Sequence, residues 1–475
     1  MTHMARGALV LAAALVAGCA VNPVSGKNEL ALVSESQEIQ MGQQASQDVA
    51  NTIGLYQDQR VQTYVSGLGK KLAAGTERPA LPWEFHVVDD PAVNAFALPG
   101  GFIFVTRGLM THINSEAELA SVVGHEIGHV TARHSVQQIS RAQVAQLGLG
   151  LGSILSSDVA KVAGVASTGL SLLFLKFSRD DESQADLLGF RYALAGGYDV
   201  REMLNLFRML GRLSANSGGG KVPQWLETHP DPGNRLAVTQ QRLDTLHTSL
   251  ADKVVGRDPY LQIVDNMIYG ENPRQGFFRG GLFLHPDLRF QLDFPSGWQT
   301  QNQTASVAAM SPAQDAIVQL TLAANKTPDA ANSEFVGQQG IQVVQTTRAS
   351  VNGSPAISTV FDAQTQQGTV RGRVTSFSYN GNAYQILGYS SAAKFSSYDG
   401  EFQRTTNSFR QLTDQAALNA QPKRVQLVRL PRAMTLEQFY QQYPSTVPVG
   451  EIALINNLNA GQTIAAGTTV KRVVG

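Results

Sequence analysis

The chain is poor in cysteine and shows no excess of either charge. Cys19 is the one cysteine among 475 residues, so no disulfide can form within the chain. Lysine and arginine total 37, as do aspartate and glutamate, and no basic stretch stands out, so an electrostatically attracted nucleic-acid partner is not expected. After the N-terminus, no apolar run reaches the length of a membrane helix. What remains is a globular chain with 43% hydrophobic residues, long enough for two or three domains.

The N-terminus "MTHMARGALVLAAALVAGCA" has the features of a secretory signal. Arg6 precedes an apolar run over residues 8–17 that is too short to span a bilayer. The ending "VAGC" resembles a bacterial lipobox, which implies cleavage before Cys19 and lipidation of that residue; the alternative is an ordinary signal peptide cut near Ala17 or Ala20. Alanine rather than aspartate at position 20 resembles outer-membrane lipoproteins. We therefore expect an outer-membrane lipoprotein of a Gram-negative bacterium, facing the periplasm.

The stretch "SVVGHEIGHVTARH", residues 121–134, is expected on a helix over about 115–136 and carries the spacing of a metal site. His125 and His129 are four residues apart, so both imidazoles lie on one helix face and can reach one Zn²⁺. Glu126 points about 100° round the helix, beside the metal, where it can act as general base. The alternative is a surface helix with solvated histidines, but the apolar neighbours argue against it. His134 lies about 140° beyond His129 and is expected to face away as a capping or packing residue.

A third ligand is expected from "SRDDESQADLLGFRYA", where Glu182 and Asp186 are one helical turn apart. Glu182 would complete the ligand set, and Asp186 would accept the second ring N–H of a ligand histidine. The alternative is an exposed acidic helix start. Two histidines and one glutamate leave a coordination position free, as catalytic rather than structural zinc sites do. The metzincin pattern would need a histidine at position 135, which is Ser135.

Together with "ESQAD" and "THPDPGNR", the motif "HEIGHVTARHS" resembles the zinc metalloproteases of metallopeptidase family 48, which includes HtpX and the CAAX prenyl endopeptidases. More narrowly it resembles their soluble periplasmic lipoprotein branch, in which "NPVSGK" and "NAFALPGGFIFV" also occur. The resemblance covers residues 34–250. It implies a gluzincin fold with one Zn²⁺ per chain and peptide-bond hydrolysis by water that the metal activates.

The resemblance also assigns roles to residues outside the two helical motifs. His229 should lie near the metal, as a reversible fourth ligand or as a donor to the oxyanion, whereas a plain turn histidine is the alternative. Arg235 should pair with an acidic group of the Glu182 helix. Gly100, Gly101 and Phe102 should belong to an edge strand along the cleft, where the glycines let a substrate backbone approach.

The order of segments predicts an α+β multidomain protein. It combines a mainly helical protease domain with a small sheet, an antiparallel α/β sandwich that resembles PsbP, and a small βααβ module that resembles LysM but has Ala433-Met434 where Gly-Asp is usual. Residues 142–176 are expected to form two buried or interfacial helices, and contact with a membrane is the alternative. The expected boundaries are 1–18 for the signal peptide, 19–33 for a tether, 34–255 for the protease domain, 256–282 for a linker, 283–413 for the sandwich and 424–475 for the LysM-like module.

Three functions follow as hypotheses. The first is a zinc endopeptidase that acts on unfolded, misfolded or misassembled envelope proteins. The second is a chaperone-like lipoprotein or assembly factor whose zinc site is kept latent by His229. The third is association with peptidoglycan through residues 424–475, which the missing Gly-Asp pair makes the weaker expectation.

Overall fold

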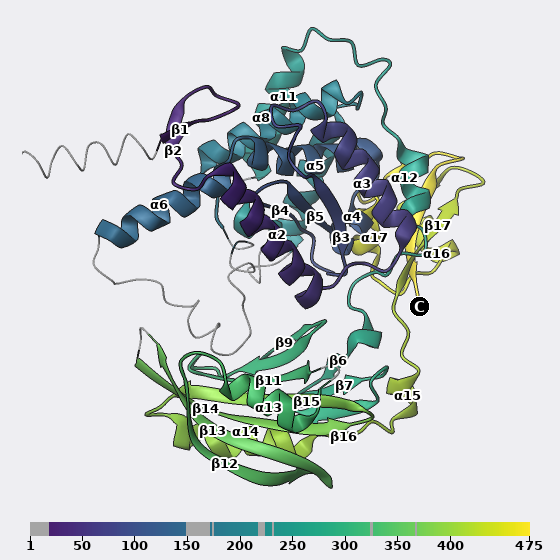
Figure 1. The fold of residues 1–475 in the computed structure, drawn as a ribbon. Helices are drawn as coiled ribbons and strands as arrows, with labels where there is room; N and C mark the ends of the chain where they lie inside the picture. The colour runs from purple at the N-terminus through teal and green to yellow at the C-terminus, as the bar shows by residue number, and fades with distance from the viewer. Residues whose placement is uncertain are drawn as a thin grey trace, which may run out of the picture.

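The computed structural model describes residues 19–148, 172, 175–216, 224–229, 232–323, 326–365 and 368–475. The expected signal peptide and residues 149–171 of the expected helical pair lie outside this part. Figure 1 shows a helical body, a green body of sheets, and a yellow C-terminal module that lies against the helical body. Within the described residues, no helix combines the length and apolarity needed to cross a bilayer.

The helical body surrounds a three-stranded sheet of order β3-β5-β4, in which β5 is parallel to β3 and antiparallel to β4. Ser34 and Gln37 form a capping box at the start of its first long helix. Its helices are α2 (Glu35–Thr52), α3 (Gln59–Ala73), α4 (Arg107–His112), α5 (Glu116–Thr131), α6 (His134–Gly148), α8 (Arg179–Ala195), α9 (Glu202–Asn216), α10 (Gln224–Thr228), α11 (Pro232–Asp244) and α12 (Arg257–Val264). Its strands are β3 (Glu84–Val88), β4 (Ala95–Leu98) and β5 (Phe102–Thr106), preceded by the hairpin β1 (Cys19–Val21) and β2 (Asn28–Leu30).

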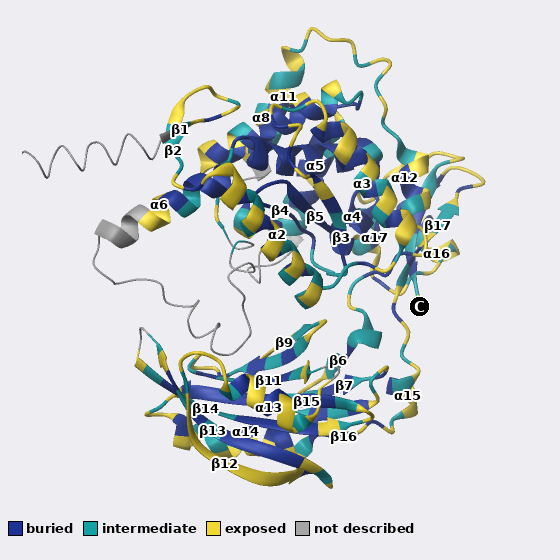
Figure 2. Ribbon diagram, in the orientation of Figure 1, coloured by how far each residue is buried: buried dark blue, intermediate teal, exposed yellow. Residues whose placement is uncertain are grey.

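Helix α5 lies in the middle of this body, and every residue from Ala117 to Thr131 is buried (Figure 2). Helix α8 packs against it so closely that the two backbones touch. A Cβ on Gly189 would lie 2.8 Å from the backbone nitrogen of His125, and a Cβ on Gly124 would lie 3.0 Å from the carbonyl oxygen of Gly189. The paired glycines therefore bring the motif of α5 and the motif of α8 to one place.

The prediction of an edge strand is wrong for Gly100, Gly101 and Phe102, although β4, which lies earlier in the same stretch "NAFALPGGFIFV", is an outer strand. Phe102 begins β5, which is the central strand, and β4 is the outer strand next to it. Both glycines have positive φ, and a Cβ on Gly100 would lie 2.6 Å from Cα of Ile39 in α2. Gly100 is therefore required by the close approach of α2 to the β4–β5 turn, and it serves packing within the fold.

The second body is a sandwich of two antiparallel sheets, of order β12-β13-β14-β15-β11-β10-β9 and β16-β8-β7-β6. Helix α14 packs on the larger sheet, whereas the outer strand β12 is mostly exposed (Figure 2). The strands are β6 (Phe277–Arg279), β7 (Leu282–His285), β8 (Phe290–Asp293), β9 (Gln299–Gln303), β10 (Ser306–Met310), β11 (Ala316–Ala323), β12 (Ile341–Val351), β13 (Ser354–Thr365), β14 (Gly368–Tyr379), β15 (Asn382–Ser391) and β16 (Arg410–Gln411). The helices are η2 (Pro273–Gln275), α13 (Pro328–Val336), α14 (Phe395–Ser408) and α15 (Gln415–Leu418).

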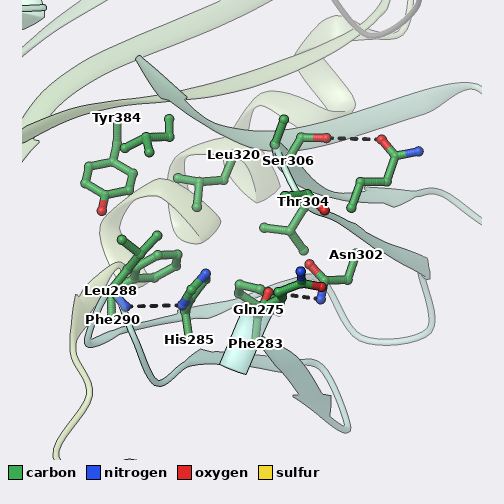
Figure 3. A pocket seen from close by; sticks show the side chains of 14 residues that line it. Gln275, Phe283, His285, Leu288, Phe290, Asn302, Thr304, Ser306, Leu320 and Tyr384 are labelled. Carbon is green, nitrogen blue, oxygen red and sulfur yellow. Dashed lines mark hydrogen bonds between the residues drawn. The ribbon is translucent and has the colours of Figure 1, made fainter. Parts of the chain in front are cut away.

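A cavity of about 50 Å³ lies between the two sheets of the sandwich (Figure 3). His285 and Phe290 line it from the smaller sheet, and Leu320 and Tyr384 line it from the larger one. The buried hydroxyl of Tyr384 has no hydrogen-bond partner among the described residues. Because an apolar cavity that accepts benzene measures about 150 Å³, this space suits a few water molecules rather than a ligand.

The segment 256–282, expected as a linker, belongs to both bodies. Tyr260 and Leu261 of α12 are buried in the core of the helical body, because the apolar face of this helix packs against α3 and α5. Strand β6 already pairs with β7 in the sandwich. The linker expectation is therefore corrected: its first part completes one core and its last part starts the next.

The C-terminal module contains the predicted strand, helix, helix and strand in that order, with two further short strands, β18 before the helices and β19 after them. Its elements are β17 (Arg424–Arg429), β18 (Met434–Thr435), α16 (Leu436–Gln442), α17 (Val449–Ile455), β19 (Thr463–Ile464) and β20 (Thr469–Val474). β17 pairs with β20, and the module has a small core of its own. Leu454 of α17, however, is buried in the core of the helical body. The module is therefore fastened to that body.

Candidate metal centre

Four buried side chains converge where α5 and α8 cross. His125, His129, Glu182 and His229 each offer one ligand atom, and these atoms all lie within 4.8 Å of one another. The Nε2 atoms of His125 and His129 are 3.0 Å apart, and Nε2 of His129 lies 3.4 Å from Oε1 of Glu182. The three residues come from one turn of α5 and the first turn of α8, whereas His229 follows α10.

The donor atoms of this cluster fit a zinc ion. Two imidazole nitrogens face each other, and Oε2 of Glu182 is buried without a hydrogen-bond partner among the described residues. Burial opposes ionisation of Glu182, but His229 and His129 lower its pKa well below the usual value, so this carboxyl group is an anion. Burial lowers the pKa of His125 to about 3, so its imidazole is neutral and able to act as a ligand. Two neutral imidazoles with one carboxylate are a donor set of catalytic zinc sites.

His125 is held from behind by an ion pair. Its Nδ1 lies 2.9 Å from Oδ1 of Asp186, and Arg235 donates to both oxygens of Asp186 at 2.8 and 2.6 Å. Nη1 of Arg235 also lies 3.3 Å from Oε2 of Glu182. Although burial alone would raise it, the pKa of Asp186 falls to about 2 beside Arg235 and His125. Asp186 therefore accepts the Nδ1 hydrogen of His125 and leaves Nε2 free to bind a metal.

Glu126 stands beside the cluster with no hydrogen bond to any described residue. The side chain is buried, and neither carboxylate oxygen has a hydrogen-bond partner among the described residues. Nε2 of His229 lies 3.7 Å from Oε1 of Glu126. Burial raises the pKa of Glu126 to about 7, which suits a group that accepts and returns a proton near neutral pH.

Two residues at this site were missed by the sequence reasoning. His134 does not face away, because α5 ends at Thr131 and α6 begins at His134, so the two helices are not continuous. Its Nδ1 lies 2.9 Å from Nδ1 of His129. Phe177, just before α8, stacks on the same imidazole with ring centroids 4.0 Å apart. The third histidine of the motif was a signal for His134, but nothing in the sequence singled out Phe177.

The geometry agrees with the comparisons with known proteins. Residues 59–243 match the model of Peptidase family M48. A mitochondrial metalloendopeptidase OMA1 of Arabidopsis thaliana is 36% identical over 187 residues, which are 39% of this chain and 36% of that protein. A beta-barrel assembly-enhancing protease of Yersinia pestis is 31% identical over 233 residues, 47% of each chain. The chain thus spans about half the length of these relatives or less.

Residues 59–243 form a metalloprotease domain. Peptidases of family M48 use zinc, and the buried cluster is a site that could hold this ion. Among solved structures, cyanobacterial PsbP from Synechocystis matches 29% of this chain and 95% of its own, at 9% identity and a TM-score of 0.24. That likeness is too low to support an argument, so the PsbP-like and LysM-like assignments stay predictions.

The contact between α5 and α8 should be intolerant of a single methyl group in the metalloprotease domain. In Gly189→Ala the new Cβ would meet backbone atoms of His125, which have no room to move, and we expect a loss of about 3 kcal/mol in unfolding free energy. Gly211→Ala in α9 is the matched control, because a Cβ there meets nothing within 4 Å and should stabilise its helix by about 0.5–1 kcal/mol. Urea denaturation of both variants measures the difference. Equal stability of the two would contradict the close contact.

Proposed function

We propose that this chain is a zinc-dependent endopeptidase of the bacterial cell envelope, which hydrolyses peptide bonds in unfolded or misassembled envelope proteins. The observation that carries the proposal is the buried carboxylate of Glu126, which lies beside the ligand cluster and has no hydrogen bond within the part of the chain that the structure describes. The expected lipid anchor at Cys19 and the similarity to a protease that enhances β-barrel assembly in Yersinia pestis favour the envelope as the place of action.

The side chains suggest how the reaction runs. Zinc, when bound, supplies a Lewis acid that polarises the scissile carbonyl and makes water more acidic. Glu126 takes the proton from the attacking water and returns it to the leaving amine, and its pKa of about 7 suits both steps. Asp186 keeps His125 in the tautomer with a free Nε2. The outer strand β4 packs against α5, and among the described residues no strand pairs with its outer edge, where an extended substrate chain would bind.

His229 restrains this site in the proposal. Its Nδ1 lies 2.8 Å from Oε1 of Glu182 and 3.2 Å from Nε2 of His125, inside the ligand cluster itself. A histidine at that position takes the place that water and substrate need. This contact also favours the second candidate function, an assembly factor or chaperone-like lipoprotein whose zinc site stays latent.

Removal of the His229 side chain should therefore activate the enzyme. We expect His229→Ala to cleave casein about tenfold faster than the unmodified chain, because an open ligand position is a requirement of catalytic zinc sites. A chelator should abolish the cleavage and added Zn²⁺ should restore it. His247→Ala, at an exposed histidine of the same body, is the control and should leave the rate unchanged. A fall of about 10²–10³-fold in His229→Ala would instead assign His229 to stabilisation of the oxyanion.

Association with the outer membrane and with peptidoglycan are further parts of the proposal. Cys19 begins strand β1, which pairs with β2 beside the helical body, so a lipid on Cys19 would hold the metalloprotease domain close to the membrane surface. The order of elements in the C-terminal module favours a LysM-like fold, although the usual Gly-Asp pair is missing. Binding of glycan by this module is the weaker inference.

A further inference from the structure

The two ligand histidines of α5 have different partners on their far sides. His125 contacts the carboxylate of Asp186, whereas Nδ1 of His129 contacts Nδ1 of His134 at 2.9 Å. Nε2 of His134 in turn lies 2.9 Å from Oε1 of Gln184 on α8. The side chains of His129 and His134 are both buried. A row of three side chains therefore runs from the ligand cluster to the side chain of Gln184.

The hydrogens along this row have one consistent arrangement. A histidine that binds metal through Nε2 keeps its hydrogen on Nδ1, so His129 must donate to His134. Nδ1 of His134 then accepts and carries no hydrogen, which places its hydrogen on Nε2, facing the oxygen of Gln184. The opposite arrangement would leave the Gln184 oxygen without a donor. His134 thus acts as a neutral acceptor.

The position of His134 depends on a helix break that is held by distant residues. Arg133 has a φ of 59°, a left-handed conformation that is uncommon for arginine. Its guanidinium donates to Glu38 of α2 at 3.0 Å and to the carbonyl of Val33 at 2.9 Å. Asn22, in the β1–β2 hairpin, donates to the carbonyl of Ala132 at 3.0 Å. These contacts turn the chain so that the first residue of α6 points back at His129.

We propose that His134 is a positioning residue that orients His129 for zinc through the hydrogen bond between their Nδ1 atoms. The inference rests on the proposed zinc function of the cluster and deepens it. The hydrogen bond fixes the ring plane and the tautomer of His129, and it makes Nε2 a better donor to the metal. Because the row ends at Gln184, the geometry of α5 is also coupled to α8, which carries Glu182.

The experiment compares two substitutions that differ in one acceptor. In His134→Asn, Oδ1 takes the place of Nδ1 and can still accept from His129, whereas His134→Leu has a similar size and no acceptor. Zinc affinity of the full chain is measured by competition with a chromophoric chelator. We expect Kd to rise about 10–100-fold in His134→Leu, the usual effect of losing a partner behind a ligand, and to stay within about threefold in His134→Asn.

A second substitution keeps the test decisive if His134→Leu unfolds, which the melting temperature of the metal-free protein reports. Gln184 is the half-buried residue at the end of the row. Gln184→Met removes the oxygen that accepts from His134 and leaves His134 itself in place. It should raise the zinc Kd by about three- to tenfold without lowering the melting temperature, a smaller change than loss of the direct partner. His285→Leu, in the sandwich, is the control for loss of a histidine remote from the cluster and should leave the zinc Kd unchanged.

Zinc affinity separates this inference from the proposed peptidase activity. An unchanged zinc Kd in a folded His134→Leu protein would overturn the role of His134, whatever the activity. An equal rise in His134→Leu and His134→Asn would overturn it as well, because only one of the two loses the acceptor. If wild-type protein binds zinc but never cleaves casein, the peptidase proposal fails while the difference between the two His134 variants still tests the positioning role.

Discussion

Glu126→Gln should leave the protein folded and able to bind zinc while it slows casein cleavage by about 10²–10⁴-fold, the usual contribution of a general base. The reason is the isolation of this carboxylate. Its oxygens have no hydrogen-bond partner among the described residues, so the substitution breaks no hydrogen bond between them. An amide is also easier to bury than a carboxylate. The melting temperature should therefore stay the same or rise while the proton acceptor is lost.

Glu116→Gln is the matched control on the same helix. Glu116 accepts hydrogen bonds from the hydroxyls of Tyr64 and Tyr198, and the oxygen of a glutamine can accept one of them, so casein cleavage should change by less than about threefold. Cleavage by Glu126→Gln within tenfold of the unmodified chain would show that another group is the base. If Glu126→Gln fully restored envelope integrity in cells that lack the protein, the assembly-factor function would be favoured over proteolysis.

The ligand residues could be predicted from the sequence because their geometry is local. His125 and His129 share a helix face through their spacing alone, and Glu182 and Asp186 share one on α8 by the same rule. The structure brings all four together, with Arg235 and His229 beside them. The spacing could not predict that α5 and α8 cross at this point. The crossing depends on the close contact between Gly189 and the backbone of His125.

The errors arose where a local pattern has a non-local cause. The helix break before His134 requires Arg133 to adopt the left-handed backbone conformation. Glu38 and Asn22, which stabilise this turn of the chain, are about a hundred residues earlier in the sequence. A continuous helix was therefore the natural expectation. Gly100 was assigned to substrate because a glycine permits close approach, yet the partner that approaches is α2. Sequence indicates that a glycine is needed, but it does not name the neighbour.

The attachment of the C-terminal module was also beyond the sequence, and it centres on a buried lysine. Lys471 in β20 is 0% exposed, and its Nζ donates to the carbonyls of Thr111 at 2.9 Å and Ile113 at 2.8 Å, at the end of α4. Around it, Arg212 of α9 donates to the carbonyl of Leu458 at 2.9 Å. A module expected to bind glycan as a separate unit is therefore bound to the segment that leads into α5.

Lys471→Met should destabilise the helical body by about 2–4 kcal/mol. The methionine fills the same space, but two buried carbonyls lose their donor, and each such loss costs about 1–3 kcal/mol. The substitution also removes the desolvation penalty of a buried ammonium group, which offsets part of this cost. Thermal unfolding should show a melting temperature lower by about 4–16 °C, since each kcal/mol corresponds to about 2–4 °C in a domain of 150–250 residues.

Lys423→Met is the control, because Lys423 is an exposed lysine of the same module, and we expect a change within about 0.5 kcal/mol. Equal melting temperatures for the two variants would mean that the Lys471 contacts contribute nothing to the stability of the helical body. The attachment of the module to the helical body also affects how glycan binding can be tested. Deleting residues 424–475 would remove Leu454 from the core of the metalloprotease domain together with the Lys471 contacts, so a loss of sacculus binding in that deletion could come from unfolding. Sacculus retention therefore has to be compared between folded full-length variants with substitutions on the exposed face of the module.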